Sequence, residues 1–321
     1  MSHGLRVGIV RPGGHESRIT MDQPSLTNRT FRYNMSVAIK LIAMDLDGTL
    51  LNSESKVPEE NARAIAEAAA RGIEILIVTG RRYHSARLIV DTLPCELHLI
   101  VNNGALIKSR EGETHQRFLL PAGIARRVLE ATPEFRSSAS VVFDRPRENQ
   151  VILETVDWDD PFRGGYFRRS REFVAQISPL TDCLNGRNGA TPDDPIQVMF
   201  VGLCQTIRDA REKLQQLDFA DQYMLSFTEY LTRDISVLDV LRQGVSKGAA
   251  LAEWTRRRGI RREEVMAIGD NWNDRDMLAF AGLPIVMGNS VDILKTQGWT
   301  LTLTNDENGL AAAIRKYALQ P

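Results

Sequence analysis

The sequence contains little cysteine, no long apolar run and almost no net charge, and each of these absences excludes a class of protein. Its 321 residues include three cysteines, which are far apart and form no C-x-x-C pair, so neither a disulfide framework nor a cysteine zinc site is indicated. A reducing cytoplasm suits such a chain. No apolar run approaches the length that crosses a bilayer. With 40 basic and 41 acidic residues the net charge is −1, so we expect no nucleic-acid or membrane partner.

Histidine is also scarce, since the chain holds five histidines and no two stand at a spacing typical of metal ligands. The composition, 43% hydrophobic and 25% charged, is that of an ordinary soluble globular protein. The length is sufficient for a large core and for two domains. We expect a cytoplasmic protein, with the oligomeric state open between a monomer and a small homo-oligomer.

Residues 1–34 differ from the rest of the chain. They are rich in Gly, Pro, Ser, Thr and Arg and show no sustained periodicity. Arginine and serine with few acids are also typical of a transit peptide. The alternatives are a disordered extension, or a start codon placed too early with Met35 as the true start. We favour these alternatives and predict an N-terminal extension without stable structure.

From Met35 onward, apolar runs alternate with helical patterns. A helix opens at Pro58-Glu59-Glu60 and stops at Gly72, and a β-branched run follows it at once, which indicates a βαβ unit with a parallel sheet. Residues 106–119 are predicted to form a hairpin with its turn at Arg110-Glu111-Gly112. The predicted strands of this sheet are residues 41–44, 73–78, 97–101, 264–268, 284–287 and 299–304.

Between residues 119 and 241 the pattern changes to period-2 strands mixed with helices, one of them expected at Arg168–Ile177. Such a mixture predicts an α+β domain with an antiparallel sheet. The fold class is therefore α/β. One α/β domain, residues 35–118 and 242–321, is interrupted by an inserted α+β domain at 119–241.

The stretch Asp45-Leu46-Asp47-Gly48-Thr49 directly follows the predicted buried strand Leu41–Met44. Two carboxylates this close repel each other unless a cation or a proton lies between them. Mg²⁺ takes such oxygen ligands, so the pair indicates a magnesium site. The alternative is an Asx-type turn that closes the strand.

Other polar residues also fall at the carboxyl end of a predicted strand or at the start of a helix. They are Thr79, Asn103, Lys247, Asp270 and Asp274. Ligands of open α/β sheets bind beyond the carboxyl ends of the strands, so we expect these side chains to gather there. Taken singly, Lys247 is an ordinary helix-start lysine, Thr79-Gly80 and Asn103-Gly104 are turns, and Asp274 is a helix cap.

Together these groups suit phosphoryl transfer. Asp45 is the candidate nucleophile, because a carboxylate can attack phosphorus and form an aspartyl-phosphate. Asp47 is the candidate general acid and base. Asp270 is the natural additional ligand for Mg²⁺, and Thr79 and Lys247 can hold the phosphoryl group.

Four motifs in order resemble those of the haloacid dehalogenase-like superfamily, in detail its Cof-like phosphatase branch. They are Asp45-Leu46-Asp47-Gly48-Thr49, Thr79-Gly80-Arg81, Lys247 and Gly269-Asp270-x-x-Asn273-Asp274. Their first residues, taking Asp270 for the last motif, are separated by 34 (79 − 45), 168 (247 − 79) and 23 (270 − 247) positions. The resemblance covers about Val37 to Tyr317 and shows no departure within the motifs.

The resemblance implies a Rossmann-like core with an inserted cap domain, Mg²⁺ dependence, and hydrolysis of a small phosphorylated metabolite such as a sugar phosphate. It makes Asp45 the nucleophile and Asp47 the acid and base, whose backbone carbonyl also binds Mg²⁺. Asp270 becomes a Mg²⁺ ligand and Asp274 its support. The substrate- and phosphate-binding set is Thr79, Gly80, Lys247, Asn103 and Asn273.

Two alternatives remain beside the phosphatase. A phosphomutase on the same core ranks lower, because large caps of this type fit phosphatases better. A silent binding module ranks lowest, because Asp45, Asp47, Lys247 and Asp270 are all present. Arg81 stays open between a substrate contact and a surface ion pair, and Asn289 is interpreted as a helix cap at most.

Overall fold

The structure is a computed structural model that describes residues 37–168, 170–186 and 193–320. The predicted extension at residues 1–34 lies outside this range. None of the helices in the described part of the chain combines the length and the apolar character that crossing a bilayer requires.

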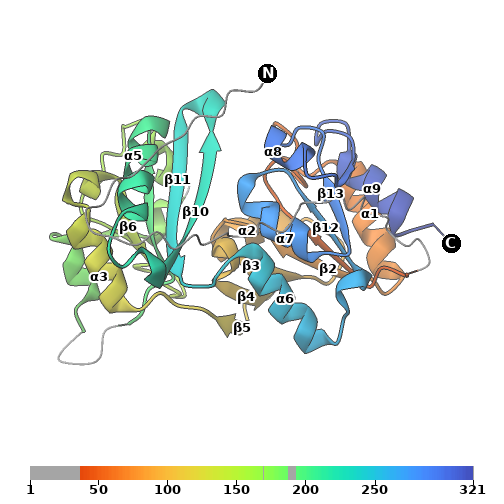
Figure 1. Cartoon of the computed structure of the whole chain (residues 1–321), viewed down its shortest axis with the longest axis horizontal. Helices are drawn as coiled ribbons and strands as arrows, with labels where there is room; N and C mark the ends of the chain where they lie inside the picture. Colours follow the sequence, from red (N-terminus) through yellow and green to blue (C-terminus); the bar gives the residue numbers. More distant parts are fainter. Residues whose placement is uncertain (1–36, 169, 187–192, 321) are drawn as a thin grey trace, which may run out of the picture. The chain divides into compact units, whose positions relative to one another are not determined.

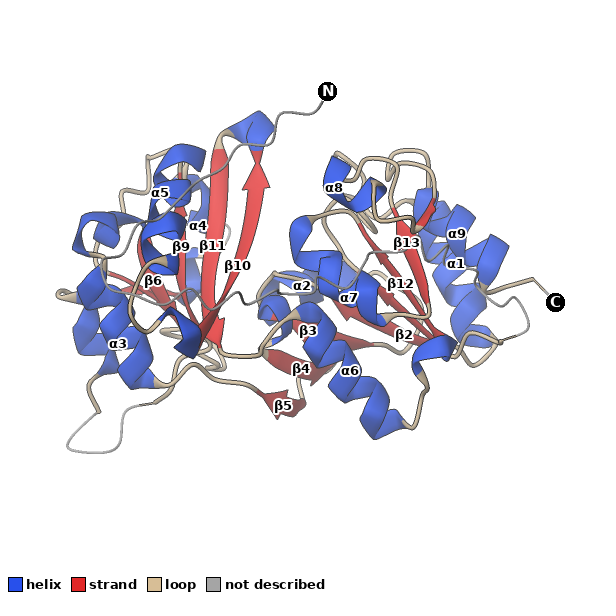
Figure 2. Ribbon diagram, viewed as in Figure 1, coloured by secondary structure: helices blue, strands red, loops and turns tan. Residues whose placement is uncertain are grey.

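The first of two sheets has eight strands in the order β14-β13-β12-β1-β2-β3-β4-β5 (Figure 2). β4 pairs antiparallel with β3 and with β5, and the other neighbours are parallel. The hairpin predicted at 106–119 is confirmed by β4 and β5. The strands are β1 (Leu41–Met44), β2 (Glu74–Val78), β3 (His98–Val101), β4 (Leu106–Ser109), β5 (Thr114–Arg117), β12 (Val265–Gly269), β13 (Leu283–Val286) and β14 (Thr300–Leu301).

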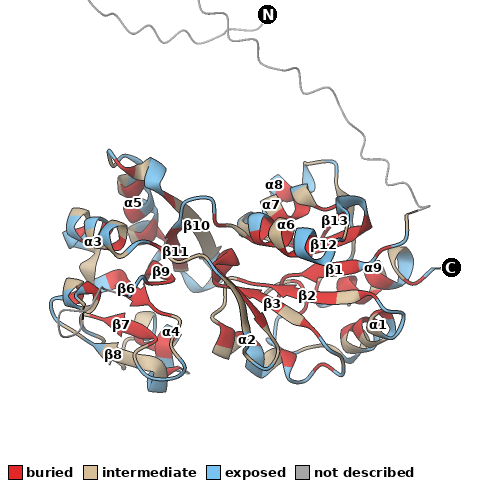
Figure 3. Cartoon of the chain, turned by 90° about the horizontal axis from the view of Figure 1, so that it is seen from below, coloured by how far each residue is buried: buried red, intermediate tan, exposed pale blue. Residues whose placement is uncertain are grey.

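β1 lies in the middle of this sheet, between β2 and β12. Met44 stands opposite Ile77 on one side and Ile268 on the other, so β1 and β12 end side by side. All four residues of β1 are fully buried, as Figure 3 shows by colour. Each such Leu or Ile side chain stabilises the fold by ~1.5–3 kcal/mol. The central place of β1 follows from this run of apolar residues, which needs cover on both faces.

Helices cover both faces of the eight-stranded sheet, and α1 and α9 lie side by side (Figure 1). Ile42 and Met44 share an apolar cluster with α1, α2 and α9, whereas Leu41 and Ala43 belong to a second cluster with α6 and α7. This alternation is the period of two expected for a strand. The helices are α1 (Glu59–Ala70), α2 (Tyr83–Val90), α6 (Lys247–Arg258), α7 (Arg275–Phe280), α8 (Asp292–Lys295) and α9 (Gly309–Tyr317).

The second sheet has six strands in the order β10-β11-β9-β6-β7-β8 and is antiparallel except for the β7–β8 pair. One face packs against α3 and α5 through a cluster that includes Val198 and Phe200. The elements are α3 (Ala122–Ala131), β6 (Ala139–Val142), β7 (Val151–Leu153), α4 (Arg163–Arg168), β8 (Val174–Gln176), β9 (Gln197–Gly202), α5 (Cys204–Gln215), β10 (Tyr223–Tyr230) and β11 (Ile235–Arg242). The predicted α/β core with an inserted α+β domain is thus confirmed.

The helix predicted at Arg168–Ile177 is wrong. The helix α4 ends at Arg168, and the stretch continues through a short 3-10 turn at Arg171–Phe173 into β8. β8 pairs parallel with β7, with Val174 opposite Val151 and Ala175 opposite Ile152. Pairing with a distant strand overrode the local helical pattern, as tertiary context commonly does.

Candidate active site

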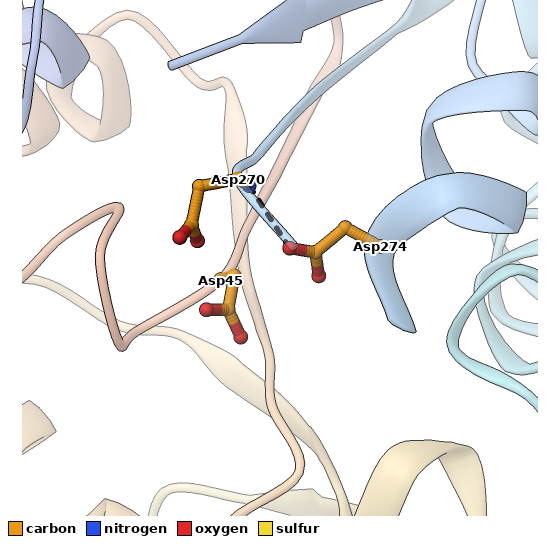
Figure 4. Close-up of side chains that lie close together, drawn as sticks. All are labelled: Asp45, Asp270 and Asp274. Carbon is orange, nitrogen blue, oxygen red and sulfur yellow. Dashed lines mark hydrogen bonds between the residues drawn. The ribbon is translucent and has the colours of Figure 1, made fainter. Parts of the chain in front are cut away.

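The carboxylates meet at the carboxyl edge of the eight-stranded sheet. Asp45 directly follows β1, Asp270 directly follows β12, and Asp274 ends the short 3-10 helix η9 (Trp272–Asp274). Figure 4 shows the three side chains converging from these elements. Each offers an oxygen, and these oxygens all lie within 4.8 Å of one another. All three residues are buried, so their mutual repulsion is only weakly screened.

Lys247 provides the cation of this cluster. It is the first residue of α6 and is 1% exposed, and its Nζ lies 2.7 Å from Asp45 Oδ1 and 2.6 Å from Asp274 Oδ1. Burial alone would lower the pKa of the Lys247 ammonium, but Asp274 and Asp45 outweigh burial and raise it. The lysine therefore remains charged between the two carboxylates.

One lysine does not balance three carboxylates. Burial raises the pKa of Asp45 to about 7 against the opposing effect of Lys247, and burial together with Asp274 and Asp45 raises the pKa of Asp270 well above its ordinary value. These shifts indicate that a further positive charge would stabilise the ionised carboxylates. An all-oxygen set of this kind suits a hard divalent ion such as Mg²⁺.

Asp274 differs from the other two carboxylates because both of its oxygens are engaged. Oδ1 accepts from Lys247, and Oδ2 accepts from the backbone N–H groups of Asp270 and Asn271, each at 3.0 Å. It therefore fixes the loop that carries Asp270. Thr49 Oγ1 donates to Asp270 Oδ1 at 3.1 Å and orients that side chain from the other side.

Gly48 leaves open the space beside Asp270. Its φ is +78°, a conformation that other residues rarely adopt, and an added Cβ would lie 2.3 Å from Asp270 Oδ2. Steric exclusion by Asp270 thus explains why the Asp-x-Asp-Gly-Thr motif has a glycine at this position. A side chain there would displace the carboxylate that faces Asp45.

Asp47 stands apart from the buried cluster. Its side chain is 34% exposed, and both of its oxygens accept from Arg81, Oδ2 from Nε at 2.7 Å and Oδ1 from Nη2 at 2.5 Å. This bidentate geometry is the strong form of an Arg–carboxylate pair. The sequence allows Arg81 either a substrate contact or a surface ion pair. In the structure Arg81 forms an ion pair with Asp47, the candidate acid and base.

The predicted binding residues form a second, mostly amide, group. Asn103 has φ +53°, and its Oδ1 accepts from Asn273 Nδ2 at 3.0 Å. The backbone N–H of Asn103 donates to the carbonyl of Thr79 at 3.1 Å, and a Cβ added to Gly80 would lie 3.0 Å from Asn103 Oδ1. The structure therefore brings Thr79, Gly80, Asn103 and Asn273 together.

Two residues of the inserted domain reach this amide group, and sequence analysis did not identify them. Asp239 of β11 accepts from Asn103 Nδ2 at 2.8 Å and from Gln197 Nε2 at 2.7 Å, and Gln197 in turn accepts from Asn102 at 3.2 Å. Burial raises the pKa of Asp239 to about 7, although the Asn103 donor opposes this. A carboxylate within an apolar strand was the available signal.

Asn289 makes two side-chain hydrogen bonds near the site that the sequence did not predict. Its Nδ2 donates to the carbonyl of Gly48 at 2.8 Å, and its Oδ1 accepts from the backbone N–H of Asn305 at 2.9 Å. It ties the turn after Asp47 to the carboxyl-edge loop that follows β13. The interpretation of Asn289 as a helix cap is wrong, because Val291 is the N-cap of α8 and the Asn289 side chain instead bridges Gly48 and Asn305 in the scaffold of the site.

The domain built on the eight-stranded sheet carries an inserted α+β domain and a carboxylate cluster at the carboxyl edge of its parallel strands. A family model described as haloacid dehalogenase-like hydrolase matches residues 42–314, and the chain belongs to that family. The chain is 31% identical to the 5-amino-6-(5-phospho-D-ribitylamino)uracil phosphatase YcsE of Bacillus subtilis over 283 residues, which are 88% of this chain and 97% of that protein. It is 30% identical to an HMP-PP phosphatase of Serratia proteamaculans over 258 residues, 80% of this chain and 86% of that protein.

Solved structures agree with this assignment. A haloacid dehalogenase-like hydrolase from B. subtilis matches with a TM-score of 0.72 at 25% identity, over 86% of this chain and 99% of that one. One from Bacteroides thetaiotaomicron matches with a TM-score of 0.70 at 25% identity, over 87% and 99%. The predicted family and its Cof-like character are confirmed, and the protein is a hydrolase of phosphoric monoesters.

Proposed function

We propose that this protein is a Mg²⁺-dependent phosphatase that hydrolyses a small, sugar-phosphate-like phosphomonoester through an aspartyl-phosphate on Asp45. The observation that supports the proposal best is the buried cluster of Asp45, Asp270, Asp274 and Lys247 at the carboxyl edge of the sheet. The relatives named above are phosphatases of phosphorylated metabolites, which supports the substrate class. A cytoplasmic location and the oligomeric state stay predictions.

In the proposed reaction, a carboxylate oxygen of Asp45 attacks phosphorus while the ester P–O bond breaks. Asp47 gives its proton to the leaving alkoxide. Asp47 then accepts a proton from water, whose oxygen attacks the phosphorus of the aspartyl-phosphate. The bond between Asp45 and phosphorus breaks and inorganic phosphate leaves. One carboxyl group thus acts first as acid and then as base.

The remaining residues hold the reacting groups. Lys247 keeps Asp45 in place and offers positive charge to the phosphoryl oxygens, and Thr79, Gly80, Asn103 and Asn273 form the polar wall of the phosphoryl site. Asp45, Asp270 and the backbone carbonyl of Asp47 would hold Mg²⁺, with Asp274 as support. When bound, Mg²⁺ supplies neutralisation of the phosphoryl charge.

The proposed domain boundaries follow the sequence analysis. Residues 35–118 and 242–321 form the catalytic core, and residues 119–241 form the cap that selects the leaving group and excludes bulk water. The hydrogen bonds that Asn103 and Asn102 donate to Asp239 and Gln197 support this division of labour. They connect the cap to the binding wall of the core.

Hydrolysis of p-nitrophenyl phosphate by the purified full chain tests the proposal. We expect turnover with Mg²⁺, loss of turnover with EDTA, recovery when Mg²⁺ is added back, and a loss of at least 10³-fold in Asp45→Asn. Arg63→Gln, a change in an exposed ion pair on α1, is the matched control. Full activity in Asp45→Asn would refute the assignment of the nucleophile. Absence of turnover with every ester tried would favour a mutase or a binding module.

A further inference from the structure

A cavity of about 400 Å³ lies beside the catalytic residues but does not include them. Its core wall comes from α2 and the β4–β5 hairpin, and its cap wall from the loop after β6 and from Gln150 and Ile196. Asp45, Asp47, Asp270 and Lys247 are not among its lining residues. The volume is within the range of small-molecule sites.

The charge of this cavity is predominantly positive. Two acidic side chains line it, against the five basic residues Arg82, Arg87, Lys108, Arg117 and Arg145. One of the acids, Asp144, is already neutralised by Lys108 at 3.0 Å and by Arg117 at 2.7 Å. Arg87 pairs with Asp91 at 3.3 Å and Arg145 pairs with Asp193 at 3.4 Å, and neither of these acids lines the cavity. The positive charge that would favour an anionic ligand is therefore that of Arg82.

Arg82 is the unpaired cation of the cavity. Its Nη1 is buried and has no hydrogen-bond partner, and among the described residues no carboxylate forms an ion pair with its guanidinium. Its Cζ lies 6.0 Å from the centre of the Phe173 ring. Burial lowers the pKa of Arg82, and the opposing effect of the Tyr166 phenol is the smaller of the two. Arg82 is half-buried, and leaving its buried Nη1 without a partner costs stability that a bound anion would restore.

Aromatic side chains supply an apolar wall. Phe143 and Tyr83 line the cavity, and the guanidinium of Arg145 lies 4.0 Å from the centre of the Phe143 ring. His84, which also lines it, stacks on Phe173 at 4.9 Å between ring centres. A ligand here would have its charged group near Arg82 and a small organic body against these rings.

We infer that the Arg82 cavity binds the anionic group, a carboxylate or a phosphate, of a small organic molecule. Two sources share this chemistry. The anion is either the remote end of the phosphomonoester substrate, which rests on the proposed function, or a separate small acid that binds core and cap together. Two observations support the substrate's remote end as the source of the anion. Arg82 follows Arg81 in sequence, and the Tyr166 phenol interacts electrostatically with both Arg82 and Asp47.

The first measurement is the rise in melting temperature of the full-length protein with succinate and with 3-phosphoglycerate. It is made on the wild type, Arg82→Gln, Arg82→Lys and the control Arg63→Gln. We expect at least one of the two anions to stabilise the wild type and the control. The stabilisation should be lost in Arg82→Gln and partly restored in Arg82→Lys, which keeps the charge. Circular dichroism shows whether each variant is folded. If Arg82→Gln is not folded, the comparison is made between the wild type and Arg82→Lys.

The second measurement separates the two sources. It compares kcat/KM for 3-phosphoglycerate and for glycerol 3-phosphate, which lacks the carboxylate. If the substrate's remote end binds Arg82, the ratio of the two values falls about tenfold or more in Arg82→Gln, as loss of a charged hydrogen bond predicts. An unchanged ratio with loss of succinate stabilisation assigns the cavity to a separate acid.

The inference is overturned if two results occur together. The anions either fail to stabilise the wild type or stabilise Arg82→Gln equally, and the ratio of kcat/KM for the two esters is the same in the wild type and in Arg82→Gln. The binding measurement does not depend on turnover. If p-nitrophenyl phosphate is not hydrolysed, the proposed function fails while the melting data still decide whether the cavity binds an anion.

Discussion

Two cations of the core, the buried Lys247 and the half-buried Arg82, differ in their partners. Lys247 lies between two carboxylates at 2.7 and 2.6 Å, whereas Arg82 has a buried nitrogen without a partner and a cavity beside it. Burial lowers the pKa of Arg82, but near Lys247 the carboxylates overcome the same effect. The charge of Lys247 is therefore neutralised by the chain itself, whereas among the described residues no carboxylate does the same for Arg82.

Among the changes that test this comparison of Lys247 with Arg82, replacing Lys247 should have the largest effect. Lys247→Met leaves Asp45 and Asp274 buried without their cation, and breaking a buried pair costs about 3–5 kcal/mol. We expect a lower melting temperature and a loss of phosphatase activity of about 10³-fold or more, measured as kcat/KM. Lys295→Met, on the short helix α8, is the control. Activity within tenfold of the wild type would show that Lys247 has a structural role only.

Asp47→Asn tests the acid and base without touching the buried cluster. The loss of a general acid costs ~10²–10⁴-fold. The loss in the first step should be smaller for p-nitrophenyl phosphate, whose leaving group hardly needs a proton, than for an alkyl phosphate. The measurement is the burst phase and the steady-state rate with both esters. Equal losses in the first step would contradict the acid role.

Arg81→Ala should have a smaller effect, because Arg81 acts through Asp47. We expect kcat for an alkyl phosphate to fall about tenfold, since the Asp47 carboxylate is no longer held by its bidentate partner. The diagnostic readout is a double-mutant cycle: in the Asp47→Asn background, Arg81→Ala should cost little more. Independent, additive losses would mean that Arg81 binds the substrate directly.

Asp239→Asn should have the smallest effect, and one that changes with pH. Burial raises the pKa of Asp239 to about 7, so the folded protein retains a proton that the unfolded chain has lost above its ordinary value of 3.8. The contribution of Asp239 to stability is thus present below pH 4 and is lost as the pH rises to about 7, with a limiting slope of ~1.4 kcal/mol per pH unit.

The melting temperature of Asp239→Asn relative to the wild type should therefore increase between pH 5 and pH 8. A difference that is constant over this range would show that Asp239 is already ionised in the folded protein at pH 5. Measurements at each pH need both variants in the same buffer, so that general effects of pH cancel.

The core and its motifs could be predicted from the sequence because their determinants are local. An apolar run followed by Asp45, and a glycine whose φ must be positive, constrain the backbone within a few residues. The partner of Asp47 could not be predicted, because Arg81 is an ordinary surface residue until β1 and β2 are aligned. β8 was predicted as a helix for the same reason, since its pairing with β7 depends on residues about 20 positions away.

The sequence marks Asp239 as a carboxylate within an apolar strand, but it does not predict which residues of the core the cap contacts. Asp239 reaches Asn103 across 136 positions, and the cavity beside Arg82 is enclosed by side chains from both domains. Such sites arise from the packing of domains, which no local pattern describes.

The central place of β1 also determines the order in which the strands of its sheet can pair during synthesis on the ribosome. Its neighbour β2 is made soon afterwards, but β12 begins 224 positions later (265 − 41), after the whole cap. Until then one edge of β1 lacks its partner, while β10 and β11 can pair as soon as they emerge. Every strand of the six-stranded sheet is thus made before β12, and a product that ends before residue 265 would contain that sheet's strands but lack β12 and Asp270.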